Sequence, residues 1–117
     1  MIANFRRFQT DADPFGRVWD VEFRWQQNGI SIRHSDTVDV KFNVWTAGEP
    51  KMEKVIALPN PDLLKLSGKT GHPLTDAWCM NLAGLHLKRM IETGEDVEKT
   101  LVTASYPELE RCADVLS

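Results

Sequence analysis

Strict alternation between apolar and charged side chains from Trp19 to Trp25 is the feature that most constrains the fold. Apolar residues fill the odd positions of this run, and charged residues fill the even ones. Successive side chains of a β-strand point to opposite faces of the sheet, so the pattern predicts a strand with one buried and one exposed face. The run leads into Asn28-Gly29, a pair that adopts the positive φ values of a tight type I′ turn. We therefore predict a β-hairpin at this point.

The two-residue turn fixes the register of this hairpin. It places Trp25 opposite Ile32 and Phe23 opposite His34 on one face. A third alternating run continues the apolar pattern from residue 38 to residue 44. The face that we expect to pack against a helix consists of these side chains: Trp19, Val21, Phe23, Trp25, Ile32, Val40, Phe42 and Val44.

A fourth strand is predicted from Met52 to Leu58, because Pro59 and Pro61 then remove the donors that a sheet requires. The first half of the chain is thus predicted to be an antiparallel meander of four strands. The sequence then changes to helical periodicity. It predicts a short helical turn over residues 62–66 and a glycine-containing loop from Ser67 to His72.

A long helix is predicted from about Leu74 to Thr93, because apolar residues recur along it at helical spacing. Certain residues suit its two ends: Pro73 or Thr75 at the start and Gly94 at the end. β-Branched residues between Glu98 and Ala104 favour a short strand. Ser105 and Glu108 have the spacing of a capping box, which predicts a final helix from Tyr106 to Leu116.

Together these elements predict a single α+β domain over residues 1–117. Its fold is an antiparallel four-stranded meander, packed on one face by a long helix, with a short C-terminal strand and helix. A chain of 117 residues has the common size of one domain with one core.

The composition argues against several classes of partner. The chain carries 14 basic and 17 acidic residues, whereas binding to phosphate backbones requires a clustered positive surface. No nucleic-acid partner is therefore expected. No apolar stretch approaches the ~20 residues of a membrane span, and the N-terminus lacks the pattern of a signal peptide, so we predict no membrane contact and a cytoplasmic location. Cys79 and Cys112 lack the spacing of a disulfide framework or redox motif, which indicates reduced thiols.

The best candidate for a small-ligand site is the loop from Gly68 to His72. It lacks the first glycine of a phosphate-binding loop, because Leu63 stands at that position, so nucleotide hydrolysis is not expected. A glycine-containing loop before a helix N-terminus still presents free amides and a positive dipole to an anion. The candidate ligand-binding residues are Lys69, Thr70 and His72. The alternative is a solvated connection in which the glycines serve only the backbone.

Neither a metal site nor a cofactor is predicted. His72, Cys79 and His86 recur every seven residues, but at 1.5 Å rise per residue the last two lie about 10 Å apart along the helix, too far to share a metal ion. A nucleophilic cysteine–histidine pair would require Cys79 beside His34. Cys79 is expected to face the core, where a thiol is usually inert. The sequence therefore favours a non-enzymatic protein over an enzyme.

Two apolar features lack a cover in the predicted fold. Trp45 interrupts the polar face of the sheet and is a candidate anchor for another chain. The long helix has a second apolar stripe: Leu74, Trp78, Leu82 and Leu85. A twofold partner presenting the same stripe would bury it, which predicts a homodimer with these interface residues: Trp45, Trp78, Leu82 and Leu85. The alternative is that the C-terminal helix fills the gap within one chain through Leu109, Cys112 and Leu116.

We therefore expect a non-enzymatic binding or accessory protein that acts through protein–protein contacts. The competing hypothesis is a small-ligand (anion) binding domain, or a small enzyme, that uses the loop from Gly68 to His72. The two hypotheses differ in whether a small ligand stabilises the native state.

Overall fold

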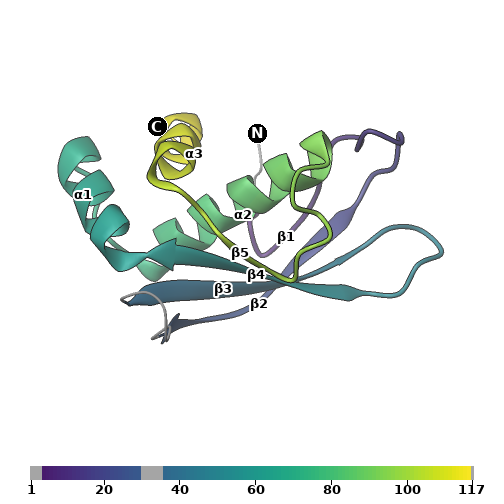
Figure 1. The fold of residues 1–117 in the computed structure, drawn as a ribbon, viewed down its shortest axis with the longest axis horizontal. Coiled ribbons are helices and arrows are strands. Elements are labelled where there is room, and N and C mark those ends of the chain that lie inside the picture. Colours follow the sequence, from purple (N-terminus) through teal and green to yellow (C-terminus); the bar gives the residue numbers. More distant parts are fainter. Residues whose placement is uncertain (1–3, 30–35, 117) are drawn as a thin grey trace.

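The computed structural model describes residues 4–29 and 36–116, and Figure 1 shows their arrangement. The strands, in chain order, are β1 (Arg7–Gln9), β2 (Asp20–Gly29), β3 (Thr37–Trp45), β4 (Met52–Pro59) and β5 (Leu101–Thr103). The helices are α1 (Asn60–Thr70), α2 (Asp76–Thr93) and α3 (Tyr106–Leu116). Across both described ranges, no helix combines the length and the apolar character that a bilayer crossing requires.

The strands form one sheet in the order β1-β2-β3-β4-β5. Neighbours from β1 to β4 run antiparallel, which confirms the predicted four-stranded meander, and β5 runs parallel to β4 at the edge. All three helices lie on one side of the sheet in Figure 1, and we call that side the inner face. The opposite side, which carries no helix from the described ranges, is the outer face. The fold is therefore α+β, as predicted.

The predicted two-residue hairpin at Asn28-Gly29 is wrong. Strand β2 continues through this pair, and Gly29 lies opposite Thr37 of β3. The expected partner residues Ile32 and His34 lie outside the described part of the chain. β3 offers β2 a nine-residue partner with an apolar inner face, and such pairing outweighs the preference of a dipeptide for a turn. The remaining strand of the meander is β1, which the sequence analysis did not predict.

A β-bulge in β2 moves Trp25 off the inner face. Phe23 pairs with Phe42, and Trp25 pairs with Lys41, the adjacent residue of β3, so Arg24 has no residue opposite it. A one-residue shift of this kind sends the following side chains to the other face of a sheet. Trp25 therefore points outward with 40% of its surface exposed, and its predicted place in the core is wrong.

The core lies between the inner face and α2. Strand β3 buries alternate side chains as predicted: Val38, Val40, Phe42 and Val44. The core-facing arc of α2 is also buried: Cys79, Ala83, Leu87, Met90 and Ile91. Helix α2 begins where Thr75 Oγ1 accepts a hydrogen bond from the Trp78 amide (3.2 Å), and it ends at Gly94, whose φ is 77°. The end at Gly94 confirms the prediction. At the start the alternative cap Thr75 is the one used, so Pro73 and Leu74 precede the helix and the predicted start at about Leu74 is wrong.

The C-terminal elements also confirm their predictions. Strand β5 is short, and the Ala104 amide extends its ladder with β4 by donating to the Ala57 carbonyl (3.0 Å). At the start of α3, the Ser105 amide donates to a carboxylate oxygen of Glu108 (3.1 Å), and the Ser105 hydroxyl donates to the same oxygen (2.8 Å). This is the predicted capping box. Helix α3 then packs against α1 and α2.

Candidate binding surfaces

The predicted anion-binding loop from Gly68 to His72 is mostly the C-terminal end of a helix. Helix α1 extends to Thr70, and Gly71 closes it with a φ of 74° and an amide that donates to the Ser67 carbonyl (2.9 Å). Amides in the last turn of a helix are used within the helix, and that end carries the negative pole of the dipole. The structure thus removes both the free amides and the positive dipole on which this site was predicted.

Each of the three candidate ligand-binding residues has a partner within the protein. Lys69 forms an ion pair with Glu110 of α3, and the hydrogen bond between them raises the pKa of the lysine. Thr70 Oγ1 accepts a hydrogen bond from the His72 amide (3.2 Å). The His72 ring stacks on Trp78, with 4.9 Å between the ring centroids. These contacts link α1 to α2 and α3, and ligand binding by these residues stays a prediction.

The second apolar stripe of α2 is largely covered within the chain. Trp78 is 3% exposed and Leu82 is fully buried, so neither is available for the interface predicted there. Leu85 is half-buried, and the N-terminal residues Phe5 and Phe8 pack beside it over α2. Helix α3 provides the rest of the cover, as the alternative hypothesis held, and its buried residues are Leu109, Cys112 and Ala113. The predicted dimer loses its basis on α2.

Gly84, in the middle of α2, marks a close approach that the sequence analysis missed. A methyl group at this position would lie 3.1 Å from the Phe5 ring, so glycine lets the N-terminal segment pack directly against the helix. Glycine within a helix costs about 1 kcal/mol relative to alanine, which makes an isolated helical glycine a signal of such packing. The segment held at Gly84 forms one wall of a groove described below.

Two tryptophans occupy the outer face, although the uncovered face of an antiparallel sheet usually carries polar side chains. Trp45 is half-buried beside two cations, with the Arg7 guanidinium 5.4 Å and the Lys51 ammonium 4.5 Å from its ring centroid. Trp25 is more exposed, and the Lys41 ammonium lies 5.4 Å from its ring. The outward position of Trp45 confirms the prediction, whereas that of Trp25 depends on the bulge.

The charges around these tryptophans are mixed in sign. Glu22 lies 3.8 Å from Arg24 and 3.9 Å from Lys51, and Glu53 lies 2.8 Å from Lys41. Basic and acidic residues are balanced on this face of β1–β4: Arg7, Arg24, Lys41 and Lys51 against Asp20, Glu22, Asp39 and Glu53. A neutral surface with aromatic rings among ion pairs suits contact with another protein and does not suit a phosphate backbone.

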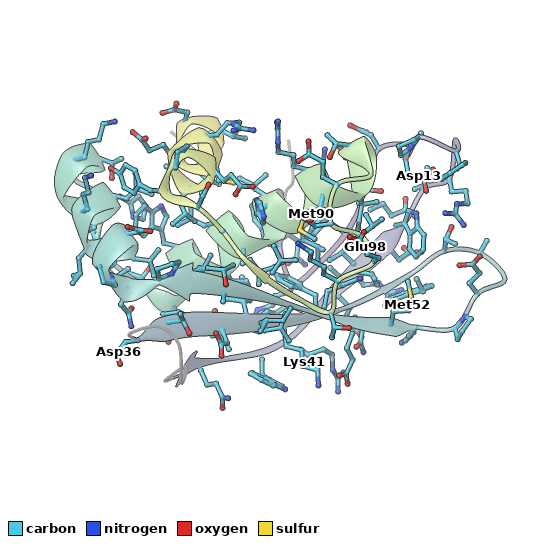
Figure 2. All side chains as sticks on the ribbon, viewed as in Figure 1. Asp13, Asp36, Lys41, Met52, Met90 and Glu98 are labelled. Atoms are coloured by element: carbon cyan, nitrogen blue, oxygen red, sulfur yellow. The ribbon has the colours of Figure 1, made fainter. Side chains whose placement is uncertain are left out.

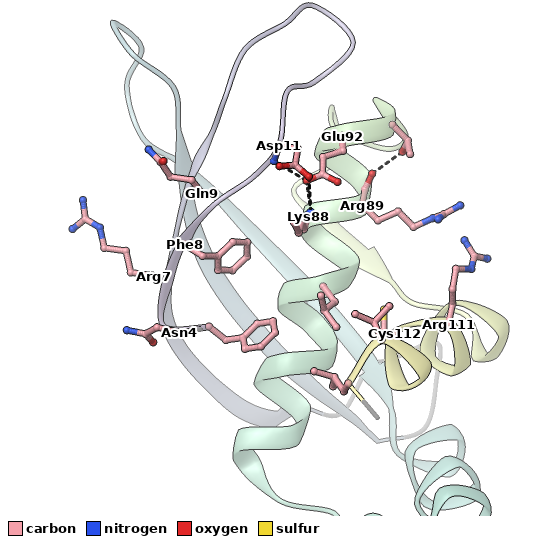
Figure 3. A pocket seen from close by; sticks show the side chains of 15 residues that line it. Asn4, Arg7, Phe8, Gln9, Asp11, Lys88, Arg89, Glu92, Arg111 and Cys112 are labelled. Atoms are coloured by element: carbon pink, nitrogen blue, oxygen red, sulfur yellow. Dashed lines mark hydrogen bonds and ion pairs between the residues drawn. The ribbon is translucent and has the colours of Figure 1, made fainter. Parts of the chain in front are cut away.

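A groove of about 830 Å³ lies between the N-terminal segment, α2 and α3. Its floor is apolar and comes from all three segments: Phe5, Phe8, Leu85, Cys112, Val115 and Leu116. On one rim, Lys88 lies 2.6 Å from Glu92 and 3.4 Å from Asp11, a cluster that Figure 3 shows with dashed lines. On another rim stand Arg89 and Arg111. Apart from Gly84, no local sequence pattern indicates this groove, because its walls come from the two ends of the chain and from α2.

Both cysteines and His86, the histidine within α2, are buried. Burial raises the pKa of the Cys79 and Cys112 thiols to about 11. His86 of α2 has Nδ1 3.3 Å from a Glu108 oxygen, but neither ring nitrogen makes a hydrogen bond within the described residues. Burial lowers the pKa of His86 despite the nearby carboxylate, so the ring is neutral at pH 7. The predicted position of Cys79 in the core is confirmed.

Two buried charged residues, Asp13 and Lys54, hydrogen-bond to neighbouring loops, and the sequence analysis missed both. Figure 2 labels Asp13. The Asp13 carboxylate accepts hydrogen bonds from Trp19 Nε1 and from the Arg17 amide, both at 2.9 Å. These bonds, with the Trp19 bond first, hold the pKa of Asp13 at about 2. Lys54 Nζ, on the inner face of β4, donates to the carbonyl of Lys99 (2.7 Å). Each charge thus has a structural role.

Comparison of the chain with protein-family models, with curated proteins and with solved structures finds no match. Within residues 4–29 and 36–116, no three or more histidine, cysteine, aspartate or glutamate side chains are grouped so as to hold a metal ion. The function therefore has to be argued from the two surfaces themselves, the outer face and the groove.

Proposed function

We propose that the protein is a non-enzymatic binding or accessory protein whose outer face makes a protein–protein contact with a second copy of the chain. The observation that carries this proposal is Trp25, which the bulge at Arg24 turns onto a helix-free face. β-Bulges commonly re-aim a side chain next to a functional site. Tryptophan is enriched among the residues that dominate binding energy, because it removes a large apolar area from water.

The charge pattern of the outer face supports a second copy as the partner. Acidic and basic residues are balanced and interspersed, so a twofold rotation can set the acids of one copy against the bases of the other. A strongly acidic or basic partner would find no complementary potential on this face. The net charge of −3 per chain gives only weak repulsion at physiological salt.

The size of the outer face also supports the proposal. Strand β3 has nine residues, which at ~3.3 Å per residue is about 30 Å. Three long strands, with the three-residue strands β1 and β5 at the edges, give a width of up to about 20 Å at ~4.8 Å spacing, and hence a planar area of at most roughly 600 Å². Side-chain relief brings the accessible area toward the ~800 Å² per partner of a stable interface.

The two cysteines, Cys79 and Cys112, fit a non-enzymatic role in a reducing compartment. Both cysteines are unbonded, which supports the cytoplasmic location expected from the sequence. Their thiols stay protonated at neutral pH, since burial raises the pKa of each to about 11. A protonated buried thiol is a poor nucleophile.

Light scattering at micromolar concentration tests the proposal. We expect about twice the chain mass of 13.3 kDa for the natural protein. Trp25→Glu places a charge in the contact and should give the monomer mass with an unchanged circular dichroism spectrum. The matched control is Leu64→Glu, because Leu64 is 62% exposed on α1, on the helical side. A monomeric natural protein, or a dimer that survives Trp25→Glu, would contradict the proposal.

A further inference from the structure

The groove between the N-terminal segment, α2 and α3 has a chemistry that the proposed dimer does not use. Figure 1 places α2 and α3 on the inner side of the sheet, and Figure 3 shows the groove that these helices form with the N-terminal segment. Its volume of about 830 Å³ falls within the ~300–1,000 Å³ of small-molecule sites. Apolar side chains from three separate segments form its floor, so the groove favours a ligand with a hydrocarbon part.

Two of the cations near the groove are already engaged. Lys88 is neutralised by Glu92 and Asp11, and the Asp11 amide also donates to Glu92 (2.8 Å), so this cluster ties the N-terminal segment to α2. Arg7 points away from the groove in Figure 3, and its guanidinium lies over the Trp45 ring on the outer face. Neither cation is therefore available to a ligand in the groove.

Arg89 of α2 and Arg111 of α3 are the cations that remain. Figure 3 shows the two side chains projecting to the same side. Both positive charges act to lower the pKa of the same buried thiol, that of Cys112. Neither guanidinium makes a hydrogen bond or an ion pair with the part of the chain that the structure describes. The guanidinium group presents a planar fork of donors that matches the two oxygens of a carboxylate.

We propose that this groove binds an amphipathic carboxylate, with the head group on Arg89 and Arg111 and the hydrocarbon tail along the apolar floor. Of the four cations in the groove lining, Arg7 and Lys88 are engaged as described, and Glu108 also acts electrostatically on Arg111. A carboxylate places one negative charge between the two remaining guanidinium groups, and its two oxygens match their donors. The α2 wall runs from Leu85 to Thr93, about 12 Å at 1.5 Å per residue, which suits a tail of medium length.

Binding in the groove is noncovalent. Cys112 is the nucleophilic side chain in the floor, and burial raises the pKa of its thiol to about 11. A thiol that stays protonated at neutral pH does not attack an activated acyl group. The ligand is therefore the free acid in its ionised form, which exchanges with solvent.

Isothermal titration calorimetry at pH 7.5 with sodium decanoate, below its micelle concentration, tests the proposal. We expect saturable binding of one decanoate per chain. Acetate has the head group without the tail, and decanol has the tail without the charge, so each should bind at least about tenfold more weakly. Equal binding of decanol, or no saturable binding of decanoate at millimolar concentration, would overturn the proposal.

The double variant Arg89→Gln/Arg111→Gln should weaken decanoate binding at least about tenfold, which is 1.4 kcal/mol. Both residues are exposed, so the fold is retained. The matched control is Arg24→Gln, which removes one exposed positive charge from the outer face and should leave decanoate affinity unchanged. Unchanged affinity in the double variant would refute the site. If the double variant instead shifts the mass measured by light scattering, the groove contacts another chain and the proposal fails. Titration of Trp25→Glu separates this inference from the proposed dimer, because decanoate affinity should persist in the monomer.

Discussion

Replacing His86 by leucine is expected to stabilise the protein. His86 is 2% exposed in α2, and within the described residues neither Nδ1 nor Nε2 has a hydrogen-bond partner. A buried polar group without a partner costs about 1–3 kcal/mol. Leucine fills a similar volume without a polar atom. We therefore expect the free energy of unfolding of His86→Leu to exceed that of the natural protein by about 1–2 kcal/mol at pH 8.

The difference in the free energy of unfolding between His86→Leu and the natural protein is expected to grow as the pH falls. Burial lowers the pKa of His86 below its ordinary 6.5; Glu108 and Asp96 raise it, and Arg89 and Arg111 lower it further. Below pH 6.5 the unfolded chain therefore binds a proton that the folded chain resists, and the natural protein loses stability from pH 6.5 down to the folded pKa. For one proton the slope is at most about 1.4 kcal/mol per pH unit. His86→Leu removes this loss.

Urea unfolding followed by tryptophan fluorescence at pH 8, 6.5 and 5.5 measures both effects. The matched control is Glu108→Gln, which keeps the capping box, since glutamine also suits that position, but removes the carboxylate 3.3 Å from His86. This control should make the natural histidine more destabilising in acid. A difference between His86→Leu and the natural protein that stays constant with pH, or a variant less stable at pH 8, would refute the reasoning.

Two further variants test structural roles. Asp13→Asn should lower the urea midpoint at pH 7. The hydrogen bond from the Trp19 side chain, with those from the Arg17 and Phe15 amides, holds the pKa of Asp13 at about 2, below its ordinary 3.8. The stability that the carboxylate provides is therefore complete above pH 3.8 and is lost as the pH falls through 2, so the deficit should shrink over that window. Gly84→Leu overfills the contact with Phe5 and should lower the free energy of unfolding by about 1–3 kcal/mol, whereas Gly84→Ala should be milder because of its helix propensity. Urea titration compares the two, and an equal loss would contradict the steric account.

Elements governed by local signals were predicted well. Gly94 ends α2 where expected, and Thr75, one of the two predicted residues for its start, caps it, because capping and a left-handed φ depend on only a few neighbouring residues. Ser105 and Glu108 form their capping box for the same reason. The inner face of β3 follows from period-two alternation, which a sheet covered on one side requires. These predictions needed no knowledge of distant partners.

Predictions that depended on how strands pair, or on how far a helix continues, failed. Asn28-Gly29 has the composition of a turn, yet the longer ladder with β3 keeps it within β2. The bulge after Phe23 leaves no trace in the alternation, so Trp25 looked like a core residue. Gly68 looked like a helix breaker, but its Cα faces open space and the helix continues to Gly71, where a positive φ is needed. For both features of β2 the deciding contact lies outside the local window.

The groove was even harder to predict from local sequence patterns. Arg89 and Arg111 stand on two different helices, and no spacing rule relates them before the helices are packed. That neither guanidinium has a hydrogen bond or ion pair among residues 4–29 and 36–116 is a property of the assembled surface. Only Gly84 carried a local trace of the groove, as a glycine inside an otherwise regular helix, because it admits the segment that forms one wall.

Strand β1 connects the two proposed surfaces. Successive residues of a strand point to opposite faces, so Arg7 lies over Trp45 on the outer face while Phe8 contributes to the groove floor. β1 has only three residues and pairs with β2 alone, so its position depends on the packing of the N-terminal segment against α2 at Gly84. Gly84→Leu should therefore disturb both surfaces together. Trp25→Glu and the double arginine variant act on one surface each, and that contrast distinguishes damage to a shared support from damage to a contact.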